Sequence, residues 1–309
     1  MRSREPIPGT LNVALATAAV AVALTLLWVA SHVESWIGRI LAAVAFSFVN
    51  NTIFSLLHEA VHGVFHRRRG VNDAFGVVTA AFFPTGFTFQ RICHLGHHAR
   101  NRTDAELFDY YYPDDNKFLK LVQWYGILTG LYWLLPPLAC LLFLICPWAL
   151  SSRFLRGDDS VVARQTGADA MLSGFARAPA ARIRLEILFS LVLQVGFFWA
   201  LDLSWQGWLL CYGAFGFNWS SLQYADHAWS NRDVRDGAWN LRVNRVVQAL
   251  FLNYHHHLAH HQHPQVPWIH LSRYVDPEVE RPSFLKIYLR MWLGPRPYPG
   301  ARSIAGPPA

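Results

Sequence analysis

Eleven of the fifteen histidines in this chain fall within three short windows. Imidazoles stand three or four residues apart in the motifs HEAVH at 58–62, HLGHH at 94–98 and HLAHH at 257–261. On a helix, this spacing puts the side chains on one face, one turn apart. Neutral imidazole nitrogen suits iron, zinc, copper and nickel. The candidate catalytic metal ligands are His58, His62, His94, His97, His98, His257, His260 and His261.

The number of candidate ligands indicates two metal ions. A tetrahedral zinc site takes four ligands, and eight histidines exceed that number. Two more histidines are candidate ligands: His227, within QYADHAWS, and His256, four residues before His260. His255 and His263 are weaker candidates, because they fall outside the repeated spacing.

Polar side chains near the motifs are candidates for orienting the ligands. A ligating imidazole usually donates its second N–H to a carboxylate, a carbonyl or a water molecule. The candidates for this role, or for holding a metal-bound water, are Glu59, Asp226 and Asn253. Asp104 and Glu106 fit this role and that of solvated carboxylates equally well, whereas His32, His66 and His270 fit solvated or capping side chains.

The composition excludes an ordinary soluble enzyme. Of the 309 residues, 53% are hydrophobic and 15% are charged, against about 25% charged in a typical soluble domain. The net charge of +7 fits cytoplasmic loops that face anionic lipid, and the chain has no nucleic-acid-binding motif. The four cysteines form no CxxC pair, which fits a reducing cytosolic face.

The hydropathy pattern predicts an all-α, polytopic membrane protein with four to six crossings and a cytoplasmic, histidine-rich cap. Residues 11–30 carry no charge and are long enough to span a bilayer; a cleaved signal peptide is the alternative. A second span is expected at 37–57, and a re-entrant or interfacial segment at 71–89. Two apolar blocks, 118–150 and 185–224, are expected to form hairpins that turn near Pro136-Pro137 and Asp202. Arginines flank the motifs, which places the site on the cytoplasmic face.

The C-terminal part is expected to contain an interfacial helix and a disordered tail. The basic, amphipathic stretch 282–293 has the composition of a helix that lies on a membrane surface. Residues 294–309 are rich in proline and glycine, which predicts disorder. We therefore expect a single membrane-embedded domain over residues 1–293, with no second soluble domain.

At the three histidine motifs, the chain resembles the membrane-bound fatty acid desaturase family. The family's histidine boxes read HxxxH, HxxHH and H/Q-xx-HH, and this chain has HEAVH, HLGHH and HLAHH in that order. The continuation NRTDAELFDY after the second box is similar to the family's T-x-D-x-E surroundings. The resemblance spans roughly residues 45–270.

The resemblance implies an oxygen-dependent desaturase with a di-iron centre. The eight histidines of the boxes would hold two iron ions, and His227 stands where family members often supply a further ligand. The substrate would be a fatty acyl chain on a membrane lipid, on coenzyme A or on a carrier protein. Because the chain has no HPGG haem-binding segment and no CxxC pairs, a separate donor such as ferredoxin or cytochrome b5 would supply electrons.

Three other functions fit part of the sequence. A fatty acyl or lipid hydroxylase would use the same di-iron scaffold, although the surroundings of the second box favour a desaturase. A membrane zinc metalloprotease would use HEAVH, with Glu59 as general base, and would leave the other two boxes unexplained. A metal transporter would instead require charged residues within the spans.

Overall fold

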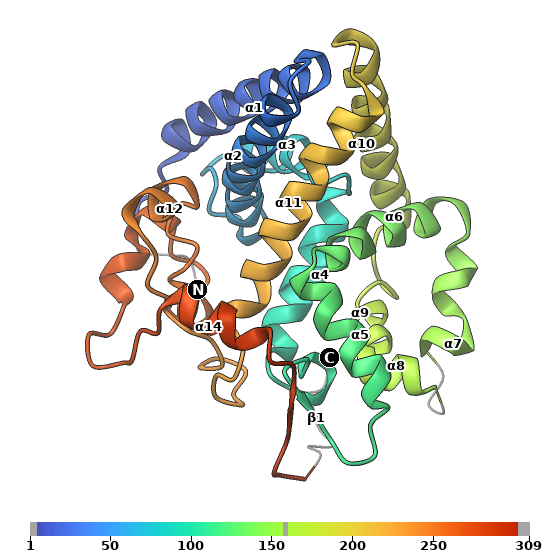
Figure 1. Cartoon of the computed structure of the whole chain (residues 1–309), viewed down its shortest axis with the longest axis vertical. Coiled ribbons are helices and arrows are strands. Elements are labelled where there is room, and N and C mark those ends of the chain that lie inside the picture. The colour runs from blue at the N-terminus through green and yellow to red at the C-terminus, as the bar shows by residue number, and fades with distance from the viewer. Residues whose placement is uncertain (1–4, 157–159, 302–309) are drawn as a thin grey trace.

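The computed structural model describes residues 5–156 and 160–301, most of which are helical (Figure 1). Four helices of 21 residues or more form the upper part of the molecule: α1 Gly9–His32, α2 Trp36–His62, α10 Ala180–Ala200 and α11 Trp205–Ala225. The other α-helices are α3 Arg69–Ala81, α4 Phe87–Arg100, α5 Lys117–Leu128, α6 Leu135–Ile145, α7 Arg153–Arg156, α8 Val161–Thr166, α9 Ala168–Ser173, α12 Arg245–Leu250, α13 His257–Gln262 and α14 Phe284–Met291. Short elements complete the described chain: η1 Asp104–Glu106, η2 Leu131–Leu134, η3 Pro147–Ser151, η4 Trp268–Tyr274, β1 Tyr110–Tyr111 and β2 Arg296–Pro297.

Three helices among the described residues are long and apolar enough to cross a membrane: α1, α2 and α10. The spans expected at 11–30 and 37–57 correspond to α1 and α2. Ser35 separates these two helices, because its side chain accepts a hydrogen bond from the Gly38 N–H at the start of α2. The segment expected to be re-entrant forms two helices, α3 and α4, and α3 at 13 residues is too short to span a bilayer.

The apolar block at 118–150 does not form the expected hairpin around Pro136-Pro137. Helix α5 and the η2–α6 segment bend by 90° at a break between Leu128 and Leu131, so together they form a broken span or a re-entrant loop. The two prolines lie within the first turn of α6, where proline is tolerated. The break falls at Gly130, whose φ is +87°; a Cβ there would lie 2.6 Å from the Phe217 backbone nitrogen of α11. A glycine is therefore needed for both the turn and the close approach.

The block at 185–224 forms two helices that turn at Asp202, as expected. Asp202 has a φ of +49° in the turn between α10 and α11. Helix α11 packs against α1 and α2, although it falls short of the apolar content of the three candidate spans. The described chain thus holds three candidate spans, or four with the α5–α6 pair, which reaches only the lower end of the expected range.

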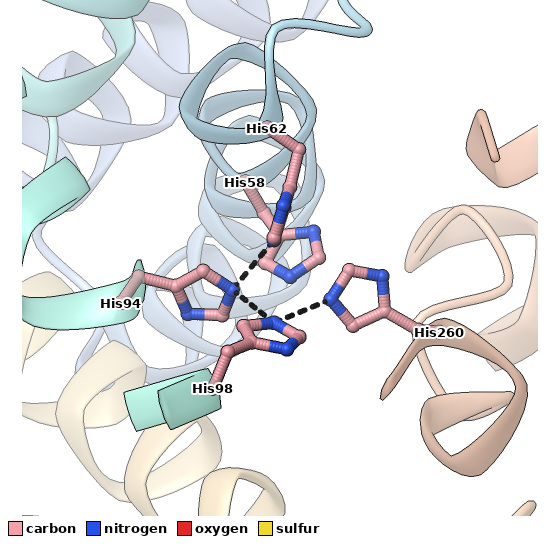
Figure 2. Close-up of side chains that lie close together, drawn as sticks. All are labelled: His58, His62, His94, His98 and His260. Carbon is pink, nitrogen blue, oxygen red and sulfur yellow. Dashed lines mark hydrogen bonds between the residues drawn. The ribbon is translucent and has the colours of Figure 1, made fainter. Parts of the chain in front are cut away.

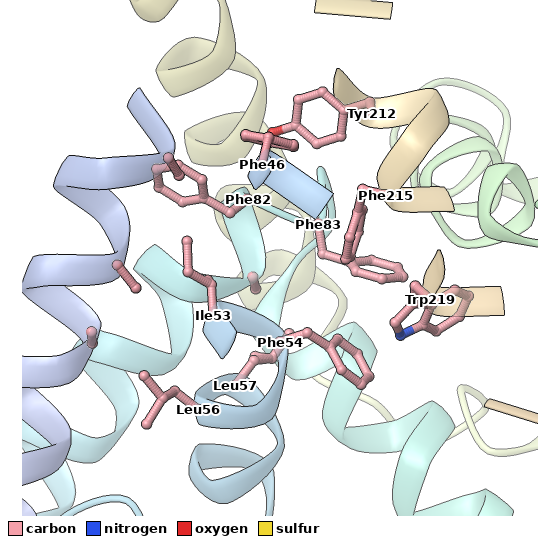
Figure 3. Packing of buried hydrophobic residues seen from close by; sticks show 14 of the residues in the cluster. Phe46, Ile53, Phe54, Leu56, Leu57, Phe82, Phe83, Tyr212, Phe215 and Trp219 are labelled. Carbon is pink, nitrogen blue, oxygen red and sulfur yellow. The ribbon is translucent and has the colours of Figure 1, made fainter. Parts of the chain in front are cut away.

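The core lies around α2 (Figure 3). Aromatic side chains from α11 and from the α3–α4 turn pack against the middle of this helix; for example, the rings of Phe54 and Trp219 lie 5.5 Å apart. Between lipid-embedded helices, such close packing stabilises association more than water exclusion does. The labelled core residues are Phe46, Ile53, Phe54, Leu56, Leu57, Phe82, Phe83, Tyr212, Phe215 and Trp219. This packing fixes the lower end of α2, which carries the first histidine motif.

The expected disorder of residues 294–309 is wrong for their first part. Strand β2 pairs in parallel with β1, and the Tyr298 ring packs against Tyr110 and Tyr112. Aromatic contacts and backbone hydrogen bonds therefore order a segment whose composition indicates disorder. Residues 302–309 lie outside the described part of the chain. The amphipathic stretch forms α14, which buries Ile287 and Met291 and exposes Leu285 and Leu289.

Candidate metal centre

The three histidine motifs lie on three helices that converge below the apolar core. HEAVH forms the last turns of α2, which ends at Gly63 because this residue adopts the left-handed conformation, with a φ of +74°. HLGHH lies in the second half of α4. HLAHH begins α13, a short helix whose residues 257–261 are all buried.

Five histidines form a first cluster, which we call the five-histidine cluster: His58, His62, His94, His98 and His260 (Figure 2). One nitrogen from each imidazole lies within 4.8 Å of the others. The Nε2 atom of His94 lies 2.8 Å from that of His62 and 3.1 Å from that of His98. The Nε2 atom of His98 lies 3.0 Å from that of His260. The Nε2 atom of His58 is buried without a hydrogen-bond partner, so it is available to a metal ion.

Four histidines form a second cluster, the four-histidine cluster: His97, His227, His257 and His261. The Nε2 atoms of His227 and His257 lie 3.0 Å apart. Both ring nitrogens of His261 are buried without partners. The two clusters are neighbours, because adjacent residues of α4 (His97 and His98) and of α13 (His260 and His261) supply different clusters.

Two imidazoles of the four-histidine cluster are oriented by hydrogen bonds from the ring nitrogen that faces away. The Nδ1 atom of His227 lies 2.9 Å from the Gly237 carbonyl oxygen, to which it donates. The Nδ1 atom of His97 lies 2.5 Å from a Glu106 carboxylate oxygen. Such bonds fix the tautomer and leave Nε2 with a free lone pair. Arg100 in turn forms an ion pair with Glu106 at 3.5 Å.

Burial lowers the pKa values of three histidines of the four-histidine cluster: His227, His257 and His261. Burial, together with the neighbouring His257 and His97, holds the pKa of His227 well below its usual value. Burial and other cluster histidines also lower the pKa values of His257 and His261. Neutral imidazole is the form that binds metals. Nine imidazoles whose nitrogens converge without a carboxylate in either cluster fit a pair of nitrogen-liganded ions such as iron.

The clusters contain all eight histidines of the boxes and His227, but not His256. The ring of His256 lies against that of His255 at a tilt of 46°, with centroids 4.1 Å apart. Because the backbone of His256 pairs with Asn240 ahead of α13, its ring does not join the face of the helix that points to the site. His255 and His263 also lie outside both clusters. His32, His66 and His270 make contacts away from the clusters, with the nearby Trp28 and Arg68 and with the distant Pro6 respectively.

The carboxylates expected beside the ligands differ in what they contact. Glu59 accepts a hydrogen bond from the Trp268 backbone N–H at 3.1 Å and lines a cavity of about 10 Å³ with His58, His257 and His260. This cavity is large enough for roughly one water molecule and borders both clusters. Glu59 thus lies close enough to act on a group bound there.

Asp226 and Asn253 do not contact the clusters through hydrogen bonds in the described structure. Asp226 is fully buried and both of its carboxylate oxygens are without partners, so burial holds its pKa well above the usual value. Asn253 donates to the Trp268 carbonyl oxygen at 3.1 Å and accepts from Gln248 at 2.9 Å. Asn253 therefore stabilises a loop, and its expected place beside the metal is not borne out by these contacts.

Arg91 joins the first two motifs, although in the sequence it indicates only a basic flank. Its guanidinium group, on α4, donates to the carbonyl oxygens of Ala60 and Val61 at the end of α2, at 3.0 and 3.2 Å. It also pairs with Asp73 at 3.2 Å. This contact fixes α2 against α4, both of which supply the five-histidine cluster. No spacing signal in the sequence indicates it, because the acceptors are backbone atoms.

A Glu106→Gln variant should hold metal more weakly. The amide keeps the size of the side chain but loses the charge that stabilises the His97 Nδ1–H donor. Removing such a carboxylate typically costs about 10- to 100-fold in metal affinity or activity. Iron retained during titration with a chelator measures the effect. Asp104→Asn is the matched control, since Asp104 pairs with Arg232 and Tyr112 instead; equal iron loss in both variants would contradict the role of Glu106.

A comparison with known protein families identifies the family to which the chain belongs. The model of the fatty acid desaturase family matches residues 34–295, which include all three histidine motifs and His227. The chain belongs to the fatty acid desaturase family. A search of curated proteins finds no match to it. Enzymes of the fatty acid desaturase family are oxidoreductases that act on fatty acids, and the apolar helices α1, α2 and α10 fit a membrane-associated member. Membership accounts for all three motifs, whereas a zinc protease would use only the first.

Proposed function

We propose that this protein introduces a double bond into a fatty acyl chain in an oxygen-dependent reaction. Two iron ions would be held by the nine clustered histidines, and a separate donor such as ferredoxin or cytochrome b5 would supply electrons. The observation that carries the proposal is the convergence of all three boxes into two adjacent, carboxylate-free histidine clusters in a chain of this family.

The bound irons would supply oxygen activation and the oxidising power to remove hydrogen from an unactivated methylene group. The residues of this chain would hold the irons and orient their ligands. Burial lowers the pKa of His227, which favours its neutral, metal-binding form, and Glu106 and the Gly237 carbonyl oxygen orient His97 and His227. The cavity beside Glu59 borders both clusters, and its small volume excludes bulk water. An acyl carbon that reaches this cavity would lie next to histidines of both clusters.

A cytoplasmic position of the site is part of the proposal. The motif at the end of α2 is followed by the basic run Arg67–Arg69, and positive residues favour the cytoplasmic side of a span. The same side is accessible to a soluble electron donor. The exposed apolar face of α14, with Leu285 and Leu289, supports contact of this part with membrane lipid.

Expression with a compatible electron donor in a lipid-producing host tests the function. Mass spectrometry of the acyl chains should show products lighter by two hydrogens, and elemental analysis of the purified protein should give two irons per chain. Products heavier by one oxygen would assign the protein to the hydroxylases. One zinc per chain, with no iron, would overturn the di-iron proposal.

A further inference from the structure

A groove of about 350 Å³ lies on the outside of the loop that leads into the third histidine motif. Its walls are Arg245, Gln248, Ala249, Asn253 and Trp268. The groove therefore combines one cation, two side-chain amides and an aromatic ring. None of these residues belongs to the histidine clusters, and the proposed chemistry leaves this groove without a role.

The groove is adjacent to the inner cavity, and one side chain lines both. Trp268 borders the groove on one side and, on the other, the cavity that contains Glu59, His58 and His257. Three contacts fix this residue: its backbone N–H donates to Glu59, its carbonyl oxygen accepts from Asn253, and its indole N–H donates to Asn12 at 2.9 Å. Trp268 thus has a fixed position, with the groove on one side and the cavity beside the histidines on the other.

The position of α12 places the groove beside a candidate membrane span. Thr52 and Ser55 of α2 donate hydrogen bonds to the carbonyl oxygens of Leu250 and Phe251, at 2.6 and 3.1 Å. Next to the groove, Val246 and Ile269 are exposed by 68% and 38%. Each of these exposed apolar residues directly follows a residue of the groove wall, Arg245 or Trp268, which suits a ligand with a hydrocarbon chain.

The positive charge of the groove favours a ligand with an anionic head group. Arg245 is exposed, and no carboxylate lies within ion-pair distance of it in the described part of the chain. Gln248 and Asn253 place further amide groups beside it. A guanidinium group flanked by amides is complementary to a carboxylate or phosphate.

We propose that this groove binds the anionic head of the acyl substrate, with Arg245 pairing with its charge. The acyl chain then extends from the groove along Trp268, whose other side lines the cavity beside the histidines. The inference rests on the proposed function for the fate of the chain. The chemistry of the head is a carboxylate or a phosphate monoester, from a free fatty acid or from an acidic lipid.

Photolabelling of the purified full-length protein in a neutral detergent tests the proposal. The probe is a fatty acid with a diazirine next to the carboxylate, and its methyl ester is the uncharged counterpart. The acid should label the segment 245–268 more strongly than the ester does. An Arg245→Gln variant should bind the acid about five-fold more weakly, as expected for loss of an exposed ion pair worth about 1 kcal/mol. Arg242→Gln, which removes an equally exposed charge outside the groove, should label like the wild type.

The outcomes separate this inference from the proposed function. Equal labelling by acid and ester, labelling confined to other segments, or unchanged affinity in Arg245→Gln would overturn it. Competition by unlabelled palmitate or by lysophosphatidate would retain it and identify the head as carboxylate or phosphate. The labelling requires no turnover, and iron is measured on the same samples. Two irons per chain without selective labelling would contradict only the binding role of the groove. Selective labelling without iron would contradict only the di-iron proposal.

Discussion

Replacing His97 with alanine should abolish oxidation of the acyl chain while the helical fold is retained. His97 is one of the four proposed ligands in the four-histidine cluster, and its Nδ1 connects that cluster to Glu106. Removal of a carboxylate behind a ligand costs about 10- to 100-fold, so loss of the ligand itself should cost more than about 100-fold. Mass spectrometry of acyl chains measures activity, and elemental analysis should show one iron per chain or fewer.

The matched control is His32→Ala. His32 lies at the far end of α1, in contact with Trp28 and 4.0 Å from Asp202, and belongs to neither cluster. This variant should keep two irons and wild-type activity. Retention of activity in His97→Ala would show that the chemistry uses HEAVH without the second box, as in the protease alternative.

Replacing Asp109 with alanine should lower the free energy of unfolding by about 3–5 kcal/mol. Asp109 is fully buried and accepts a hydrogen bond from Arg102 at 2.7 Å, while the Arg102 side chain is 1% exposed. Without the carboxylate, Arg102 is left as an uncompensated buried charge, which is the costly way to break a buried pair. Thermal unfolding of the protein in detergent measures the loss.

The same substitution should also disturb the four-histidine cluster. Asp109 accepts from the Trp229 N–H at 2.6 Å, and Arg102 donates to the Ser230 carbonyl oxygen at 3.0 Å. These contacts fix the turn that carries His227. The double variant Arg102→Met with Asp109→Leu removes both charges and should recover much of the stability. If the double variant is as unstable as Asp109→Ala, the cost does not come from the unpaired charge.

The spacing of the histidines was enough to predict which residues of the boxes share a site. Residues three or four apart on a helix share a face. Imidazoles on three such faces can bind metal ions together when the faces converge, whereas a single face offers too few ligands. His227 was predicted from the family resemblance, because family members often supply a further ligand at that place. The other additional candidate, His256, lies outside both clusters, because a backbone pairing with Asn240 sets the chain direction before α13. Local spacing carries no information on such a long-range contact.

Long-range backbone contacts also explain the errors in the fold. The break at Gly130 depends on its approach to Phe217, and the order of Arg296–Pro297 depends on pairing with Tyr110–Tyr111. Proline pairs and a proline-rich tail are local signals, and in both cases a distant partner overrides them. The roles of Arg91 and Arg102 were missed for the same reason, since each donates to backbone oxygens far along the chain.

Adjacent histidines of one helix serve different clusters, both in α4 and in α13. A single rigid helix therefore cannot adjust to an ion in one cluster without moving a ligand of the other. The first ion to bind also immobilises most of the ligands for the second. The helices therefore lose most of their conformational entropy before the second ion binds. Loading should consequently be cooperative: at low iron supply, empty and fully loaded chains should coexist, with few chains that hold a single ion.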